Sequence, residues 1–237
     1  MINPIAAAQL TISTVVVIHG AWWTVLSLLA LPTPAIRTSA KGSALDTVVV
    51  VPAHNEELLI GATLGSLFSA GSSHRPEVLV VADNCTDATA AIARSLGATV
   101  LERTDEARRG KPYALAFALE HISNRPTHPD VLVVVDADST VSDSFFEAIE
   151  AKIAAGARAV QVHYAAGPAA TDLGRLRRLA FSLVHWSRPL GASRLGLGTT
   201  LKGNGMAFSW EAAALGLSGT GVTEDAESTL CLLYTSD

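Results

Sequence analysis

Two aspartates separated by one residue, Asp136 and Asp138, end an apolar run and are the first candidates for chemistry in this sequence. Neighbouring carboxylates repel each other, and proteins relieve the repulsion by sharing a proton or by binding a hard divalent cation, which can also hold a diphosphate. The pair therefore predicts a metal and diphosphate site. The structural alternative is that Asp138 begins a turn, with Ser142 or Asp143 capping the next helix.

Acidic residues also follow two earlier apolar runs: Glu56 follows residues 47–51, and Asp83 follows residues 78–81. The carboxyl ends of parallel strands meet at one edge of a sheet, and ligands bind there in open α/β folds. Three strands that each end in an acid predict one shared site. Capping of the following helices by Asn55, and by Thr86 or Asp87, is the alternative for each segment taken alone.

Three further segments carry candidate residues. Lys111 beside Gly110 places a cation near a predicted helix N-terminus, where phosphate oxygens bind, although most lysines are simply solvated. The segment Gly203-Asn204-Gly205 suits a close approach of the backbone to a ligand, or a tight turn. Glu224 and Asp225 follow a threonine, which predicts a helix cap, or a base that accepts the proton of an incoming hydroxyl.

The elements that must position these residues alternate between strands and helices, which predicts an α/β fold with a mostly parallel sheet flanked by helices. An unbroken β-branched run such as residues 131–135 is typical of a strand buried on both faces. Strands are predicted near residues 47–51, 78–81, 98–101, 131–135 and 159–162. Helices are predicted over residues 86–96 and 173–186. Two more are predicted to begin at residues 55 and 111, and another to end at about residue 155.

Residues 1–32 predict an N-terminal transmembrane helix, because no charge occurs between Ile5 and Leu31. As a helix this stretch would span roughly 40 Å, more than the hydrocarbon layer of about 30 Å. Arg37 and Lys41 follow it, which favours a cytoplasmic catalytic domain. A cleaved signal peptide fits less well because no basic segment precedes the run, and a buried helix of a soluble protein is the remaining alternative. Residues 33–45 resemble a linker.

Composition excludes several classes of protein. The net charge of −5 argues against a nucleic-acid-binding protein, because such proteins need a cationic surface. The two cysteines show no metal-ligand spacing and define no disulfide framework. The seven histidines form no zinc-binding motif.

Taken together, the motifs resemble those of glycosyltransferase family 2, particularly its membrane-bound enzymes such as cellulose, chitin, hyaluronan, poly-N-acetylglucosamine and ceramide glucosyltransferases. The resemblance covers about Asp46 to Leu233. The segments that carry it, in the family's order, are Pro52-Ala53-His54-Asn55-Glu56, Asp83-Asn84-Cys85-Thr86-Asp87, Gly110-Lys111, Asp136-Ala137-Asp138, Gly203-Asn204-Gly205 and Thr223-Glu224-Asp225.

The resemblance implies a GT-A fold over residues 46–237 and an inverting, metal-dependent transfer of sugar from a nucleotide sugar, expected to be a UDP-sugar, to a polysaccharide or lipid acceptor. It implies that Asp138, with Asp136, holds Mg²⁺ or Mn²⁺, that Asp225 is the catalytic base, and that Glu224 lies beside it. The residues implied to bind the nucleotide sugar are Pro52, Ala53, Glu56, Asp83, Lys111, Asp136, Gly203, Asn204 and Gly205.

The sequence also departs from the membrane-bound relatives. Their Gln/Arg-x-x-Arg-Trp motif would follow the base, and the chain stops before it, so we expect a C-terminally truncated domain. A module that binds nucleotide sugar without turnover is therefore an alternative, and a sugar-nucleotide pyrophosphorylase is a weaker one. The predicted helix over residues 173–186 has Arg175, Arg177 and Arg178 opposite its leucines, which fits a membrane surface or an ordinary solvated helix.

Overall fold

The computed structural model describes residues 3–31, 45–70, 75–167, 169–197 and 201–216. The chain divides into two compact units. The first comprises Met1–Ala35 and His163–Thr199, and the second comprises Ile36–Val162 and Thr200–Asp237. Residues 163–199, which the sequence assigns to the domain of the sheet, group with the N-terminal helix. Glu224 and Asp225 lie outside the described residues.

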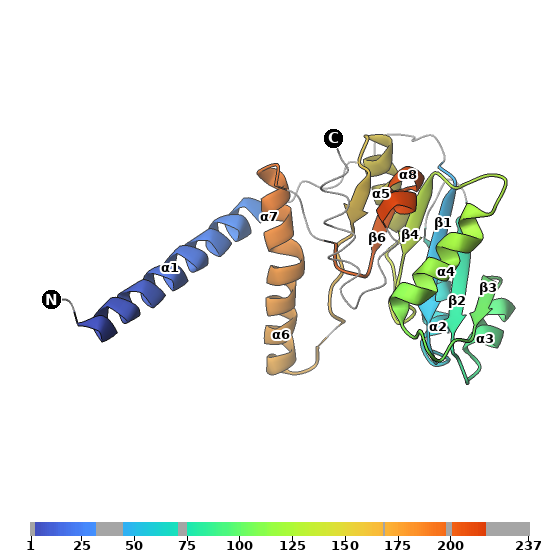
Figure 1. Ribbon diagram of the computed structural model, residues 1–237, viewed down its shortest axis with the longest axis horizontal. Helices are drawn as coiled ribbons and strands as arrows, with labels where there is room; N and C mark the ends of the chain where they lie inside the picture. Colours follow the sequence, from blue (N-terminus) through green and yellow to red (C-terminus); the bar gives the residue numbers. More distant parts are fainter. Residues whose placement is uncertain (1–2, 32–44, 71–74, 168, 198–200, 217–237) are drawn as a thin grey trace. The chain divides into compact units, whose positions relative to one another are not determined.

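The second unit is built on a six-stranded sheet with the strand order β3-β2-β1-β4-β6-β5 (Figure 1). Strands β1 to β4 pair in parallel, whereas β6 is antiparallel to both β4 and β5. The strands are β1 Thr47–Ala53, β2 Glu77–Asp83, β3 Thr99–Arg103, β4 Val131–Val134, β5 Ala159–Gln161 and β6 Met206–Ser209. The predicted α/β fold with a mostly parallel sheet is confirmed.

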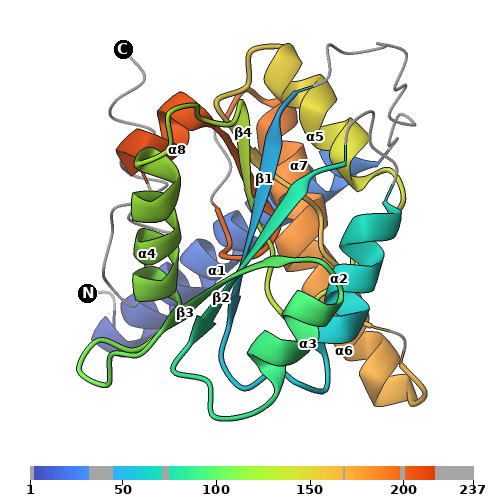
Figure 2. The same ribbon diagram turned by 90° about the vertical axis from the view of Figure 1, so that its right-hand side faces the viewer.

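Helices cover both faces of this sheet because the side chains of each central strand alternate between two apolar cores. Val49 and Val51 point into one core, together with apolar residues of three helices, α2 Ile60–Ser69, α3 Thr89–Ser95 and α5 Phe145–Ala154. Val48 and Val50 point into the other core, with α4 Lys111–Ser123 and α8 Trp210–Gly216. Figure 2 shows these two helical layers on either side of the strands. The central strands therefore leave polar groups at their ends.

The helix predicted from Asn55 begins later, at Ile60. Asn55 has a φ of 55°, in the left-handed region, which an α-helix does not accommodate. Leu58 and Leu59, which the helix predicted from residue 55 would include, lie before α2 and are 89% and 46% exposed, whereas Leu64 and Leu67 of α2 are buried. The start of α4 was predicted correctly, with Pro112 in the first turn.

The sequence did not predict strand β6, because the neighbouring segment Gly203-Asn204-Gly205 was interpreted through its two glycines. Met206, Ala207 and Phe208 are buried, and the strand lies between β4 and β5. A strand of four residues is too short to show a clear period-2 pattern in the sequence. Its strand conformation depends on hydrogen-bonded pairing with β4.

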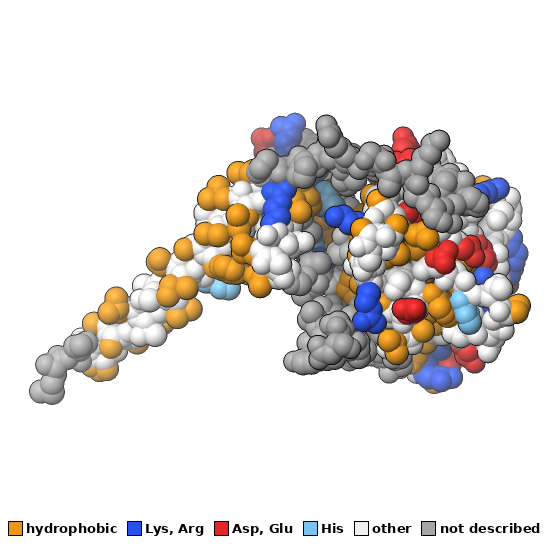
Figure 3. Space-filling model, turned by 90° about the horizontal axis from the view of Figure 1, so that it is seen from above, with side chains coloured by type: hydrophobic (Ala, Val, Ile, Leu, Met, Phe, Trp, Pro, Cys, Tyr) orange, Lys and Arg blue, Asp and Glu red, His pale blue; other side chains and the backbone are white. Residues whose placement is uncertain are grey.

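The first unit contains α1 Pro4–Ala30, α6 Asp172–Ser182, a π-helical turn η1 Leu183–Ser187, and α7 Arg188–Arg194. Helix α1 is long enough and apolar enough to cross a membrane, and Figure 3 shows hydrophobic side chains along it. Helix α7 packs on the C-terminal part of α1 at Gly191, where a Cβ atom would lie 2.0 Å from the carbonyl oxygen of Leu26. The Arg188 guanidinium lies 4.2 Å from the centre of the Trp23 ring.

We expect Gly191→Ala to destabilise the packing of α1 on α7 by about 1–3 kcal/mol, because the added methyl group has no room beside Leu26. Thermal unfolding of the full chain in detergent micelles measures this loss. Gly20→Ala is the matched control, since nothing lies within 4 Å of its added Cβ and alanine favours the helix. Equal unfolding temperatures for the two variants would contradict the close approach.

Candidate functional site

A cavity of about 480 Å³ opens at the carboxyl ends of β1, β2 and β4. Seven predicted site residues line it: Pro52, Ala53, Glu56, Asp83, Lys111, Asp136 and Asp138. The parallel pairing brings them together, because Ala53 is in register with Ala82 and Val50 with Val134. The acids that follow three separate strands therefore do meet at one edge of the sheet.

The cavity also contains residues that sequence reasoning did not assign to the site. His54, Asn84 and Arg109 line it together with Gly110, Ala114 and Ala137. His54 and Asn84 lie inside the motifs that carry the family resemblance, so their position beside strand-end residues was a usable signal. Arg109 lies in a polar loop, where charged residues are ordinary, and nothing local distinguishes it.

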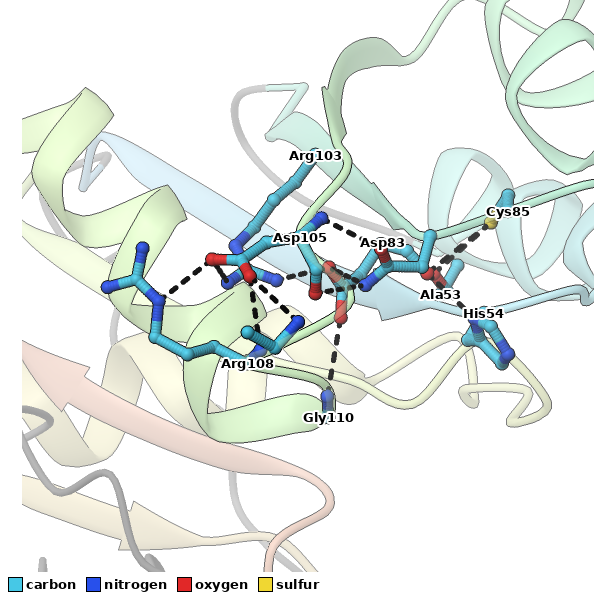
Figure 4. A network of polar contacts seen from close by, with 10 residues as sticks. Ala53, His54, Asp83, Cys85, Arg103, Asp105, Arg108 and Gly110 are labelled. Carbon is cyan, nitrogen blue, oxygen red and sulfur yellow. Dashed lines mark hydrogen bonds and ion pairs between the residues drawn. The ribbon is translucent and has the colours of Figure 1, made fainter.

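The carboxylate of Asp83 is buried at the end of β2 and held by an arginine from the neighbouring strand (Figure 4). Arg103 Nη1 donates to Asp83 Oδ1 at 2.6 Å, and these two side chains are 10% and 6% exposed. Asn84 Nδ2 donates to the same oxygen at 3.0 Å, and the Gly110 amide lies 3.4 Å from Asp83 Oδ2. The Asp83 carboxylate is therefore held in one orientation, with its second oxygen directed to the loop that lines the cavity.

Asp105 extends this network on the side of Arg103. Arg103 Nη2 lies 3.1 Å from Asp105 Oδ2, and Arg108 Nε donates to the same oxygen at 2.8 Å. Desolvation opposes ionisation of Asp105, but the hydrogen bonds and charge of Arg108, with the charge of Arg103, hold the pKa of Asp105 below its usual value. Asp105 therefore stays ionised to a lower pH than an unperturbed aspartate does.

The loops after β1 and β2 are joined by side chains. Asn55 Oδ1 accepts from the Thr86 amide at 2.8 Å, and the Glu57 amide donates to Asp87 Oδ2 at 3.1 Å. Glu57 Oε2 in turn accepts from the Ala88 amide at 3.0 Å. Asp87 also accepts from the amide and hydroxyl of Thr89, but the N-cap of α3 is Ala88 and not Thr86 or Asp87, so the capping alternative for this segment was wrong. Asn55 binds the other loop and does not cap α2.

The hydrogen bonds from Thr89 and Glu57 also act on the ionisation of Asp87. Desolvation opposes its charged form, but these bonds together lower the pKa of Asp87 below its usual value. The stabilisation they bring is therefore present above the ordinary aspartate pKa of about 4 and is lost as the pH falls through the lowered value.

Lys111 connects three parts of the site. Its Nζ forms an ion pair with Asp136 and donates a hydrogen bond to the carbonyl oxygen of Gly203. These contacts join the N-terminus of α4, the segment after β4 and the loop before β6. The positive charge of Lys111 is therefore located in the cavity beside the two aspartates.

The segment Gly203-Asn204-Gly205 does not line the cavity, but it holds the residues that do. Asn204 Oδ1 accepts from the Asp136 amide at 3.1 Å, and Asn204 Nδ2 donates to Ser139 Oγ at 2.8 Å. Gly203 and Gly205 have φ values of 77° and 65°, which glycine adopts without strain. The tight turn that the sequence offered is therefore present, and it lies beside residues that line the cavity.

The donor set at Asp138 fits a hard divalent cation that shares its ligands with a substrate. Asp138 is exposed in the cavity, and its Oδ1 accepts from Ser139 Oγ at 3.3 Å. Within the described part of the chain, no group of three or more His, Cys, Asp and Glu side chains could hold a metal. A cation here would need oxygens from a diphosphate and from water, which is the usual manner of Mg²⁺ binding.

Comparisons with known sequences agree with this picture. The family model for "Glycosyl transferase family 2" matches residues 48–209. The 4,4'-diaponeurosporenoate glycosyltransferase of Staphylococcus aureus is 38% identical over 96 residues, which are 39% of this chain and 24% of that protein. The enzyme of the same name from Staphylococcus haemolyticus is 35% identical over 114 residues, 46% of this chain and 28% of that protein. These matches span about a quarter of the relatives' length.

Solved structures show the same fold. The mannosyltransferase PcManGT from Pyrobaculum calidifontis, in complex with GDP-Man and Mn²⁺, superposes with a TM-score of 0.62 at 19% identity, over 94% of this chain and 61% of that one. Glucosyl-3-phosphoglycerate synthase from Mycobacterium tuberculosis, in complex with Mn²⁺, UDP-glucose and phosphoglyceric acid, has a TM-score of 0.50 at 25% identity, over 77% and 64%. The predicted GT-A fold is thereby confirmed.

We expect Arg103→Met to destabilise the protein by about 3–5 kcal/mol, because the buried carboxylate of Asp83 would lose its ion-pair partner. Urea unfolding at pH 7 measures the change. Arg94→Met is the matched control: its pair with Glu102 is exposed, so the cost should stay below about 1 kcal/mol. Similar losses in both variants would contradict the role assigned to Arg103.

Proposed function

Since a family model matches residues 48–209, the chain belongs to glycosyl transferase family 2, and we propose that it transfers a sugar from a nucleotide-sugar donor to an acceptor hydroxyl with inversion. The observation that carries this proposal is the cavity at the ends of β1, β2 and β4, which gathers Glu56, Asp83, Lys111, Asp136 and Asp138. Its volume of about 480 Å³ lies within the usual range of ligand sites, roughly 300–1,000 Å³.

The nucleoside part of the donor binds on the β1 and β2 side in this proposal. Pro52 and Ala53 provide backbone and apolar surface, Asp83 accepts a hydrogen bond from a base N–H group, and Glu56 accepts from ribose or base. The ion pair with Arg103 supports this role because it holds the Asp83 carboxylate in one orientation. We propose UDP as the nucleotide, on the family resemblance and the UDP-glucose complex of the mycobacterial synthase.

The diphosphate binds on the β4 side. Lys111 exchanges part of its contact with Asp136 and Gly203 for phosphate oxygens, which its position at the N-terminus of α4 favours. Asp138, with Asp136 as the second candidate, would hold Mg²⁺ or Mn²⁺. When bound, the ion would offset the negative charge that develops on the leaving diphosphate. Asn204 orients this segment through the Asp136 amide and Ser139.

The family resemblance supplies the roles of the residues that act on the acceptor. Asp225 takes the proton of the acceptor hydroxyl as that oxygen attacks the sugar carbon, and the bond from this carbon to the diphosphate breaks on the opposite side, which inverts its configuration. Glu224 lies beside the base. Gly203, Asn204 and Gly205 border the donor sugar and the acceptor.

The acceptor is a lipid or polysaccharide presented at a membrane. Helix α1 supports this location, since it is long and apolar enough to cross a bilayer once. Arg37 and Lys41 after it favour a cytoplasmic sheet domain. The curated relatives are named for glycosyl transfer to 4,4'-diaponeurosporenoate. We favour a membrane-borne acceptor on these two grounds.

The role of Asp138 predicts a loss of metal-dependent binding. We expect Asp138→Ala to abolish the gain in UDP affinity that Mn²⁺ brings, because the carboxylate that would hold the ion is removed. Calorimetric titration of UDP with and without Mn²⁺ measures this gain. Asp143→Ala, which removes an exposed carboxylate outside the cavity, should retain it. Unchanged metal dependence in Asp138→Ala would refute the assignment.

The role of Asp225 predicts a loss of turnover without a loss of binding. We expect Asp225→Asn to lower Mn²⁺-dependent UDP release from UDP-sugars by about 10²–10⁴-fold, the usual contribution of a catalytic base. A panel of UDP- and GDP-sugars identifies the donor in the same assay. Glu227→Gln, two residues further on, is the control. If wild type and variant bind UDP equally and neither turns it over, the binding-module alternative is supported.

A further inference from the structure

Helix α6 and the first residue of η1 present a leucine face that no described residue of their unit covers. Leu173, Leu176, Leu179 and Leu183 recur at the spacing of one helical stripe, and we call them the leucine face. They are 59%, 62%, 57% and 36% exposed. A row of exposed leucines of this length is unusual on a solvated helix and indicates a binding surface.

The opposite side of α6 is the one that contacts its own unit. Phe181 stacks on His185 with ring centres 4.1 Å apart and meets the edge of Tyr164 at 5.4 Å. The Tyr164 hydroxyl lies 2.9 Å from His185 Nδ1, which fixes this aromatic cluster. Phe181 lies away from the leucine stripe at 3.6 residues per turn, so the leucine face points outward from the cluster.

Basic side chains accompany the leucine face. Arg175 and Arg177 lie on its two flanks, and Arg178 lies nearly opposite to it, as helical spacing requires. Asp172 at the first turn is paired with Arg175 at 3.1 Å. An apolar stripe flanked by arginines is the pattern of helices that lie in the interface of an anionic bilayer, where the guanidinium groups reach the phosphates.

The connection of α6 to α1 indicates where α6 lies relative to the membrane. Through η1, α6 continues into α7, which packs on the end of α1 that carries Trp23 and Leu26. Arg194 Nη1 donates to the carbonyl oxygens of Leu29 and Leu31, and so caps that end. Tryptophans and arginines belong at the level where a span leaves the hydrocarbon. Figure 1 shows α6 leaving this end at an angle to α1 and not alongside it.

We propose that α6 lies on the surface of an anionic lipid bilayer, with the leucine face in the hydrocarbon boundary and Arg175 and Arg177 at the lipid phosphates. This inference rests on the proposed membrane span of α1. It adds a second contact with lipid, located between β5 and β6 of the chain. A second protein molecule is a less favoured occupant, because the candidate span belongs to the same compact unit.

The test uses the full chain with Cys85 and Cys231 replaced by serine, reconstituted into vesicles of phosphatidylcholine with or without phosphatidylglycerol. An environment-sensitive fluorophore is attached to Ala180→Cys, on the leucine face, to Arg178→Cys, on the opposite side, or to Val16→Cys, in the middle of α1. A face buried about 5–10 Å into the headgroup boundary should be quenched by spin-labelled lipid and protected from iodide. We expect quenching by lipid and protection from iodide at positions 180 and 16, and neither at position 178.

The contribution of charge is tested with the label at position 180. Arg175→Gln should lower the partition of α6 onto anionic vesicles roughly fivefold, as expected for one basic residue at such a surface. Arg178→Gln, which removes the same charge on the far side, should lower it less. Equal behaviour in vesicles with and without phosphatidylglycerol would overturn the anionic assignment.

The outcomes separate this inference from the proposed function. Lipid quenching at position 16 without quenching at position 180 would overturn the proposal for α6 and leave the span intact. Absence of quenching at both positions would refute the span itself. Protection of position 180 from iodide without lipid quenching would show that protein covers the leucine face, and would also overturn the proposal.

Discussion

Burial of the central strands on both faces is the constraint on which the rest of the structure depends. β1, β2 and β4 alternate valines and leucines into two cores, so no polar side chain is tolerated along most of their length. The polar residues are therefore confined to the strand ends. Since the strands are parallel neighbours, their carboxyl ends coincide, and residues from distant parts of the sequence share one cavity.

Specific partners offset the desolvation of the acids at this edge and the repulsion between them. Asp83 is buried, and Arg103, Asn84 and the Gly110 amide surround its carboxylate. Asp136 has Lys111, while Asn204 fixes the Asp136 amide. Buried charges with complete sets of partners have few alternative arrangements. The position of the Asp83 carboxylate in the cavity is thus set by the protein before a ligand enters.

The sequence predicted what depends on local pattern and short motifs. The β-branched runs identified β1, β2 and β4, and the acids after them identified the edge of the site. It did not predict what depends on pairing between distant segments. Nothing in the polar run around Arg103 marks it as the partner of Asp83, because that pair arises from the alignment of β2 with β3. Likewise β6 exists because β4 and β5 offer it hydrogen bonds, and the late start of α2 follows from the φ of Asn55.

The ion pair between Lys111 and Asp136 has a kinetic consequence. A diphosphate that approaches the cavity meets a lysine whose charge is already offset, on a protein whose net charge is −5. Long-range attraction is therefore weak, and capture depends on an exchange of partners at short range. Encounter with an anionic donor should accordingly be slow relative to electrostatically guided association, and added salt, which screens the repulsion by a negatively charged protein, should not slow it further.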